Sequence, residues 1–146
     1  MLKPLIEHQK EIKDIFKKME FLRDNFDFGN PKAFYEELYD LVKDIRSELD
    51  YHFNLQTYSA GENPKAKKFV LENLLVKDML FRMLDFIKAK AVENSPDAFL
   101  KFDDFEEILK AYLKKEKGLF LQQIREVLSE GEINEIEKKL KNLIKQ

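Results

Sequence analysis

The feature that most constrains this chain is how few places it has where it can turn. Only four clusters of turn-forming residues occur, at 25–31 (NFDFGNP), 59–64 (SAGENP), 94–96 (NSP) and 129–132 (SEGE). Glycine and proline number four each among 146 residues, whereas charged residues make up 37%. This composition is typical of long helices joined by short connections. The clusters divide the chain into four long segments and one short tail.

Within these segments, apolar residues recur every three or four positions, which is the spacing of one face of a helix. The third segment, about 65–92, is apolar on more than one face, so we expect it to be deeply buried or to cover another surface. In the tail, Ser129 and Glu132 have the spacing of a capping box that opens a last helix. No segment has the alternating pattern of a strand. The sequence therefore predicts an all-α, up-down-up-down four-helix bundle with a short fifth C-terminal helix, in a single domain over residues 1–146. In the fourth segment we expect the inner face to comprise Phe105, Ile108, Leu109, Tyr112, Glu116, Leu119, Phe120 and Ile124.

Composition excludes several classes of protein. The chain has no cysteine, which rules out disulfides, thiolate metal sites and thiol catalysis. Its formal charge of −2 argues against a nucleic-acid-binding surface, and no apolar run approaches the ~20 residues of a membrane span. The charged N-terminus does not resemble a signal peptide, so we expect a cytoplasmic protein. Because no phosphate-binding loop or hydrolase motif occurs either, we expect that the protein is not an enzyme.

Polar residues interrupt the apolar stripes near their centres. His8 lies between Leu5 and Ile12 in the first stripe, His52 and Gln56 continue the second, and Glu116 lies in the fourth. A buried carboxylate is costly unless it is paired, protonated or bound to a cation. These residues therefore mark a site in the core or a buried polar network.

The two histidines are expected at one level of the bundle. His8 lies about 20 residues before the first turn and His52 about 22 after it, so each is ~30 Å from that turn at the helical rise. Two imidazoles and the Glu116 carboxylate could form a metal site, or could be hydrogen-bonded core residues without a metal. Glu48, one turn before His52, is expected to pair with a lysine rather than to bind a metal. Tyr112, like Gln56, is expected to support the site or to pack.

Short motifs resemble those of the hemerythrin-like (HHE cation-binding) family over nearly the whole chain. LIEHQKEI resembles the first-helix motif, with His8 at its ligand position. YHFNLQ resembles the second-helix His-Phe-x-x-Glu motif, with His52 retained and Gln56 replacing the glutamate. YLKKEKGLF resembles the fourth-helix His-x-x-x-Glu motif, with Tyr112 replacing the histidine and Glu116 retained, and LSEGEINEI resembles the tail that follows it.

The third-helix histidine of that family has no counterpart here. The position that corresponds to this histidine is Asp78, in the segment DMLFR, or Lys77, one residue earlier. Family members hold two bridged irons with about five histidines and two carboxylates, and they bind or sense oxygen, nitric oxide or iron. This chain has two histidines in total. The resemblance thus implies the fold of the family but a degenerate metal site.

Two functions remain open at this point. The first is a domain that has lost the diiron centre and acts as a non-catalytic structural, interaction or regulatory module, with a protein partner or a second copy as possible partners and no role for nucleic acid or membrane. The second is a residual mononuclear site for iron, zinc or manganese, with iron favoured and an oxygen- or iron-related sensing role. Its expected ligands are His8, His52, Glu116 and Asp78.

Overall fold

The structure is a computed structural model that describes residues 1–145, and within this range the regular secondary structure is entirely helical, with no strand. No helix within it is both long enough and apolar enough to cross a membrane. The prediction of an all-α protein is therefore confirmed. The elements are α1 (Lys3–Asp24), α2 (Pro31–Thr57), a 3-10 turn η1 (Ala60–Glu62), α3 (Lys67–Val92), α4 (Asp97–Lys115), a π-helical turn η2 (Glu116–Phe120), α5 (Leu121–Val127) and α6 (Glu130–Lys145).

The helix ends follow from local chemistry. Proline occupies the first turn of both α1 and α2. Backbone N–H groups in the first turn have no partner within the helix, so the N–H that proline lacks costs no hydrogen bond there. After α3, Asn94 adopts a left-handed backbone (φ 53°), and the Ser95 N–H donates back to the carbonyl of Lys90 at 2.9 Å. Asparagine tolerates this conformation better than most residues, so NSP ends α3 and permits the turn into α4.

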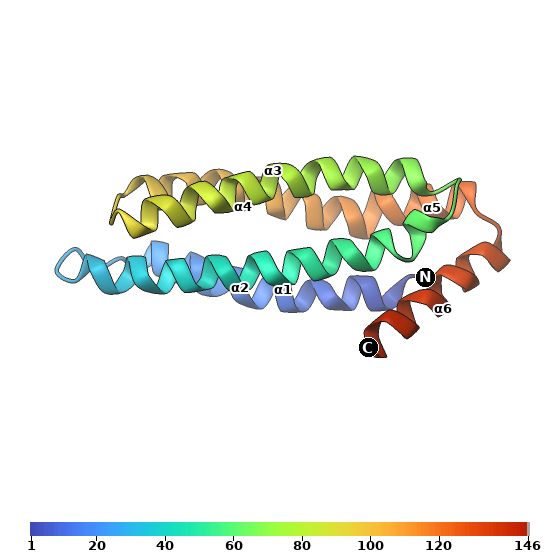
Figure 1. The fold of residues 1–146 in the computed structure, drawn as a ribbon, viewed down its shortest axis with the longest axis horizontal. Helices are drawn as coiled ribbons and strands as arrows, with labels where there is room; N and C mark the ends of the chain where they lie inside the picture. Colours follow the sequence, from blue (N-terminus) through green and yellow to red (C-terminus); the bar gives the residue numbers. More distant parts are fainter. Residues whose placement is uncertain (146) are drawn as a thin grey trace.

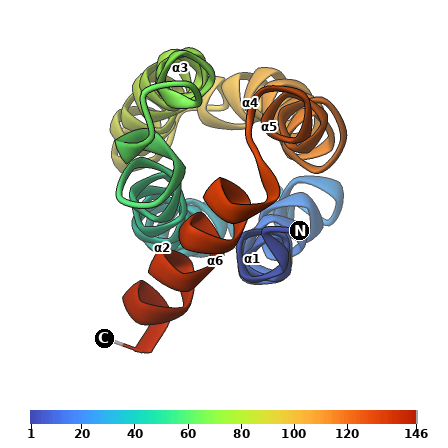
Figure 2. The ribbon, with the colours of Figure 1, turned by 90° about the vertical axis from the view of Figure 1, so that its right-hand side faces the viewer.

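The four longest helices lie lengthwise beside one another (Figure 1). The turn between α1 and α2 and the turn between α3 and α4 lie at the left end of Figure 1, and η1 lies at the right end. Viewed along the long axis, α1, α2, α3 and α4 surround a common interior, and α6 crosses the end of α1 and α2 (Figure 2). Both termini lie at the end that α6 crosses.

The interior contains two separate apolar clusters. The larger one lies between α1, α2, α3 and α4 and includes Ile12, Phe53 and Leu80. The smaller one lies toward the end covered by α6 and includes Leu5 and Phe120. On α1, on α3 and at the end of α4, a buried polar residue lies between the members of the two clusters, and these residues belong to the site described below.

One predicted stripe is wrong at its C-terminal end. The wider π-helical turn at Glu116–Phe120 shifts the register of the face that follows α4. As a result Leu119, expected inside, is 48% exposed, whereas Phe120 and Ile124 are completely buried. An unbroken helix had been expected here, because a π-helical turn leaves no mark in the spacing of apolar residues.

The predicted capping box of the last helix is confirmed. The Ser129 N–H donates to the Glu132 carboxylate at 3.1 Å, and the Glu132 N–H donates to the Ser129 hydroxyl at 3.2 Å. The same carboxylate accepts hydrogen bonds from Asn63 and Lys65, both at 2.9 Å. These contacts join α6 to the connection between α2 and α3. Together they lower the pKa of Glu132 to about 2, the Asn63 hydrogen bond contributing most.

We predict that Glu132→Gln reduces the acid sensitivity of the fold. Because the folded-state pKa lies below the ordinary 4.5, ionised Glu132 stabilises the fold above pH 4.5, and this stabilisation is lost as the pH falls toward 2. The wild type should lose more unfolding free energy over this interval than Glu132→Gln does, as measured by urea unfolding at each pH. Glu135→Gln, an exposed change on the same helix, serves as control and should behave like the wild type. Identical acid profiles for Glu132→Gln and the wild type would contradict the prediction.

Candidate functional site

A layer of polar side chains separates the two apolar clusters. Each helix of the interior contributes to it: Gln9 from α1, His52 and Gln56 from α2, Asn73 from α3, and Glu116 at the start of the π-helical turn. All five side chains are 2% exposed or less. Because unpaired polar groups are costly at such burial, the hydrogen bonds among these residues determine whether the layer is tolerated.

Glu116 is at the centre of this layer, and its carboxylate accepts hydrogen bonds from three elements. Gln9 donates through Nε2 at 2.9 Å to Oε1. The His52 Nε2 lies 2.7 Å from both carboxylate oxygens, and Gln56 donates through Nε2 to Oε2. The Tyr112 hydroxyl donates to Oε2 at 3.2 Å. A buried carboxylate with this many donors is compensated without a cation.

The donors to Glu116 are themselves held in place. Gln9 also donates to the backbone carbonyl of Leu113 at 3.0 Å. Asn73 donates to the Gln56 side-chain oxygen at 3.0 Å, which fixes the orientation of that amide toward Glu116. Burial, with the Glu116 carboxylate nearby, raises the pKa of Tyr112 well above its usual value, so its hydroxyl remains a donor at neutral pH.

From Glu116 a chain of hydrogen bonds leads toward the surface. His52 contacts Glu116 through Nε2 and His8 through Nδ1, where the two Nδ1 atoms are 2.9 Å apart. The Nε2 of His8 lies 2.8 Å from Glu48, whose side chain is 37% exposed. Burial lowers the pKa of His8, and the hydrogen bond to Glu48 opposes this effect without reversing it.

The three hydrogen bonds of this chain need three protons. Two neutral imidazoles supply two, because each carries one N–H. With both carboxylates ionised, no arrangement of two protons can place one in each of the three contacts. Completing the third contact takes a third proton on one of the four side chains.

The structure brings together the five core positions singled out in the sequence, namely His8, His52, Gln56, Tyr112 and Glu116. Four of them are buried, and His8 is partly exposed, with 11% of its side chain accessible. Glu48 also joins this group, but the expectation that it would pair with a lysine is wrong. Glu48 pairs with His8 of α1, which lies beside the face of α2 that carries Glu48.

The expected contribution of helix three is corrected. The exposed side chain of Asp78 pairs with Arg82 at 3.0 Å, and Lys77 pairs with Asp50 of α2 at 3.0 Å. Neither residue reaches the layer, because both lie away from the inner face that Val70, Leu80 and Leu84 define. Asn73 takes that place, one turn closer to the start of α3.

The sequence reading missed two residues of the layer, Gln9 and Asn73. Both carried the signal used for the others, a polar residue at helical spacing within an apolar stripe. Gln9 lies four residues after Leu5 and three before Ile12, and Asn73 lies three residues after Val70. Gln9 lies next to His8, which occupies the same part of the apolar stripe, and the apolar excess of helix three leaves its inner face undefined in the sequence.

The side chains do not have the arrangement of a metal site. Metal ligands converge on one point, whereas the nitrogens of His8 face His52 and Glu48, and those of His52 face His8 and Glu116. Within residues 1–145 no group of three or more histidine, cysteine, aspartate or glutamate side chains is placed to hold a metal ion. As arranged here, the donors fit hydrogen bonding to each other rather than to a cation.

Comparisons with protein-family models, with curated proteins and with solved structures returned no match.

We predict that Glu116→Gln is tolerated and that His52→Leu is not. In Glu116→Gln the new amide N–H can donate to His52 Nε2, once the Gln9 amide has turned over so that its oxygen, instead of Nε2, faces the new NH2. His52 then donates through Nδ1 to His8, and His8 donates to Glu48, so that two neutral imidazoles complete all three contacts. The unfolding free energy should change by less than about 1 kcal/mol, as for most mild substitutions.

His52→Leu removes a donor and leaves the Glu116 carboxylate short of a partner, which should cost about 1–3 kcal/mol. Urea unfolding of the two variants and the wild type measures both values. A larger loss for Glu116→Gln than for His52→Leu would contradict this account of the chain.

Proposed function

We propose that this protein is a hemerythrin-like domain, an up-down-up-down four-helix bundle in which a hydrogen-bonded polar layer replaces the diiron centre. In this proposal it acts as a non-catalytic structural, interaction or regulatory module. The order and spacing of LIEHQKEI, YHFNLQ and YLKKEKGLF along the chain support the family assignment.

The observation that carries the proposal concerns the two positions that depart from the family pattern. Gln56 stands where the family has glutamate, and Tyr112 where it has histidine. Each departure removes a metal ligand, and each supplies a hydrogen-bond donor that contacts Glu116. The same two substitutions that weaken a metal site therefore provide what the retained carboxylate needs when no metal is bound.

The second candidate is a mononuclear site formed by His8, His52 and Glu116, with iron, zinc or manganese as the ion. The contact between two imidazoles and a carboxylate favours it, since this is a common ligand set for non-heme iron. It would require both imidazoles to turn so that one nitrogen of each faces a common point.

We predict that the protein does not form an oxygen-bridged diiron chromophore. Two histidines in the chain cannot supply the nitrogen ligands that the family uses. The measurement is the visible spectrum and the iron content after reconstitution with ferrous iron and exposure to air. A stoichiometric oxo-diiron absorption band with two irons per chain would refute the proposal.

We further predict that a chelator leaves the melting temperature of the wild type unchanged. A bound metal raises stability only when it binds the folded state, so its removal lowers the melting temperature. Thermal melts of protein purified without chelators, recorded with and without EDTA, provide the measurement, and Glu116→Gln provides the control. A fall of several degrees in the wild type alone would favour the mononuclear site.

A further inference from the structure

A groove lies between α1 and α4, and Gln9, which donates to Glu116 in the polar layer, is among the residues that line it. The pairs α1–α2, α2–α3 and α3–α4 pack closely along their backbones, whereas α1 and α4 lie further apart. The groove between them has a volume of about 390 Å³, within the range of small-molecule sites of roughly 300–1,000 Å³. Its floor is formed by Phe16, Leu109 and Leu113.

The groove carries a strong excess of positive charge. Five lysines line it, together with a single carboxylate, that of Glu20. Lys110 is engaged at the Glu20 end, where its Nζ lies 3.2 Å from that carboxylate. Across residues 1–145, no ion pair involves Lys13, Lys17, Lys114 or Lys117. A neutral or cationic ligand would leave these ammonium groups uncompensated.

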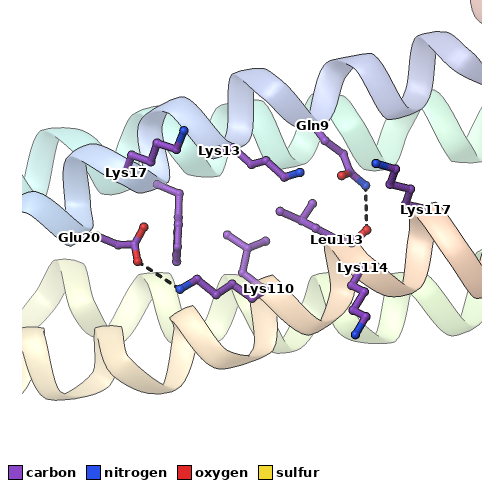
Figure 3. Close-up of a pocket in the computed structure, with 10 residues that line it drawn as sticks. Gln9, Lys13, Lys17, Glu20, Lys110, Leu113, Lys114 and Lys117 are labelled. Atoms are coloured by element: carbon purple, nitrogen blue, oxygen red, sulfur yellow. Dashed lines mark hydrogen bonds and ion pairs between the residues drawn. The ribbon is translucent and has the colours of Figure 1, made fainter.

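The uncompensated charge that faces the hollow is concentrated at one end. Lys13 of α1 and Lys117 of the π-helical turn extend toward each other near Gln9 (Figure 3). In the same view Lys17 and Lys114 point away from the groove. Gln9, Lys13 and Lys117 also line an adjoining open hollow, whose other charged residues are Lys10, Lys17, Glu7 and Asp14, so that lysines outnumber carboxylates there as well.

The groove therefore has a cationic end followed by an apolar floor. Lysine side chains contribute aliphatic stems to its walls while their charged ends stay in water. Along α1 the groove extends from Gln9 to Glu20, a separation of eleven residues, which corresponds to roughly 16 Å at the helical rise. This shape suits a slender apolar tail with one anionic end. The groove does not suit an acidic helix, because such a helix would need lysines that face the groove along both of its edges.

We propose that this groove binds a free long-chain carboxylate. In this arrangement the carboxylate lies between Lys13 and Lys117 beside Gln9, and the alkyl chain lies over Phe16, Leu109 and Leu113 toward Glu20. This site shares only Gln9 with the polar layer and does not depend on the assignment of that layer.

The test uses sodium dodecanoate, below its micelle-forming concentration, in isothermal titration calorimetry with the full chain. We expect saturable binding with one site per chain. Acetate, which lacks the tail, and dodecanol, which lacks the charge, should each bind at least about tenfold more weakly, as loss of one of the two contributions implies.

The matched variants lie in the same groove. Lys13→Gln with Lys117→Gln should weaken dodecanoate binding by about tenfold or more, because both ion partners of the carboxylate are lost. Lys17→Gln with Lys114→Gln removes the same charge from side chains that point away, and should change binding by less than about twofold. Amide NMR shifts of Phe16 and Leu113 on titration should locate the ligand.

Three outcomes would overturn the proposal. Equal weakening by the two double variants would indicate a general charge effect, and dodecanol binding as tightly as dodecanoate would remove the role of the lysines. Co-sedimentation with phosphatidylglycerol vesicles, without any response to dodecanoate, would assign the lysines to a membrane surface instead.

Discussion

The structure depends on how one buried carboxylate is compensated. Glu116 is completely buried where four helical elements meet, and an uncompensated charge there would cost more than the domain could offset. Gln9, His52, Gln56 and Tyr112 each donate to it. Since these donors come from α1, α2 and α4, the carboxylate fixes the axial position of those helices relative to one another.

The polar layer also determines how the interior is divided. It separates the larger apolar cluster from the smaller one under α6. Apolar stripes alone tolerate sliding by one turn, whereas a buried network is satisfied in only one register. Asn73 extends this constraint to α3 through Gln56, and Lys115 extends it to the edge of the layer by donating to Asn73 at 3.2 Å. In addition, Gln9 joins the layer to the α1–α4 groove, since it both donates to Glu116 and lines that groove.

Much of this arrangement can be read from the sequence, because it follows from periodicity. His8, His52 and Glu116 were identifiable as polar interruptions of helical stripes, and the Ser129–Glu132 cap as a local motif. Other features depend on three-dimensional packing. The π-helical turn that exposes Leu119 has no sequence signature, and the inner face of α3 is ambiguous while its apolar residues cover several faces. The resemblance to the family places the third-helix position at Asp78 or Lys77, and nothing in the sequence corrects that register to Asn73. Likewise, Glu48 pairs with His8 because of the separation between two helices, which the order of residues does not specify.

We propose that hydrogen bonds, without a metal, hold Glu116 in the core. The most direct test is a crystal structure of protein purified without chelators, with anomalous data collected above the iron and zinc absorption edges. We predict continuous contacts from Glu116 through His52 and His8 to Glu48, with no anomalous peak among them. A peak within bonding distance of His8, His52 and Glu116, with both imidazoles turned toward it, would contradict the account.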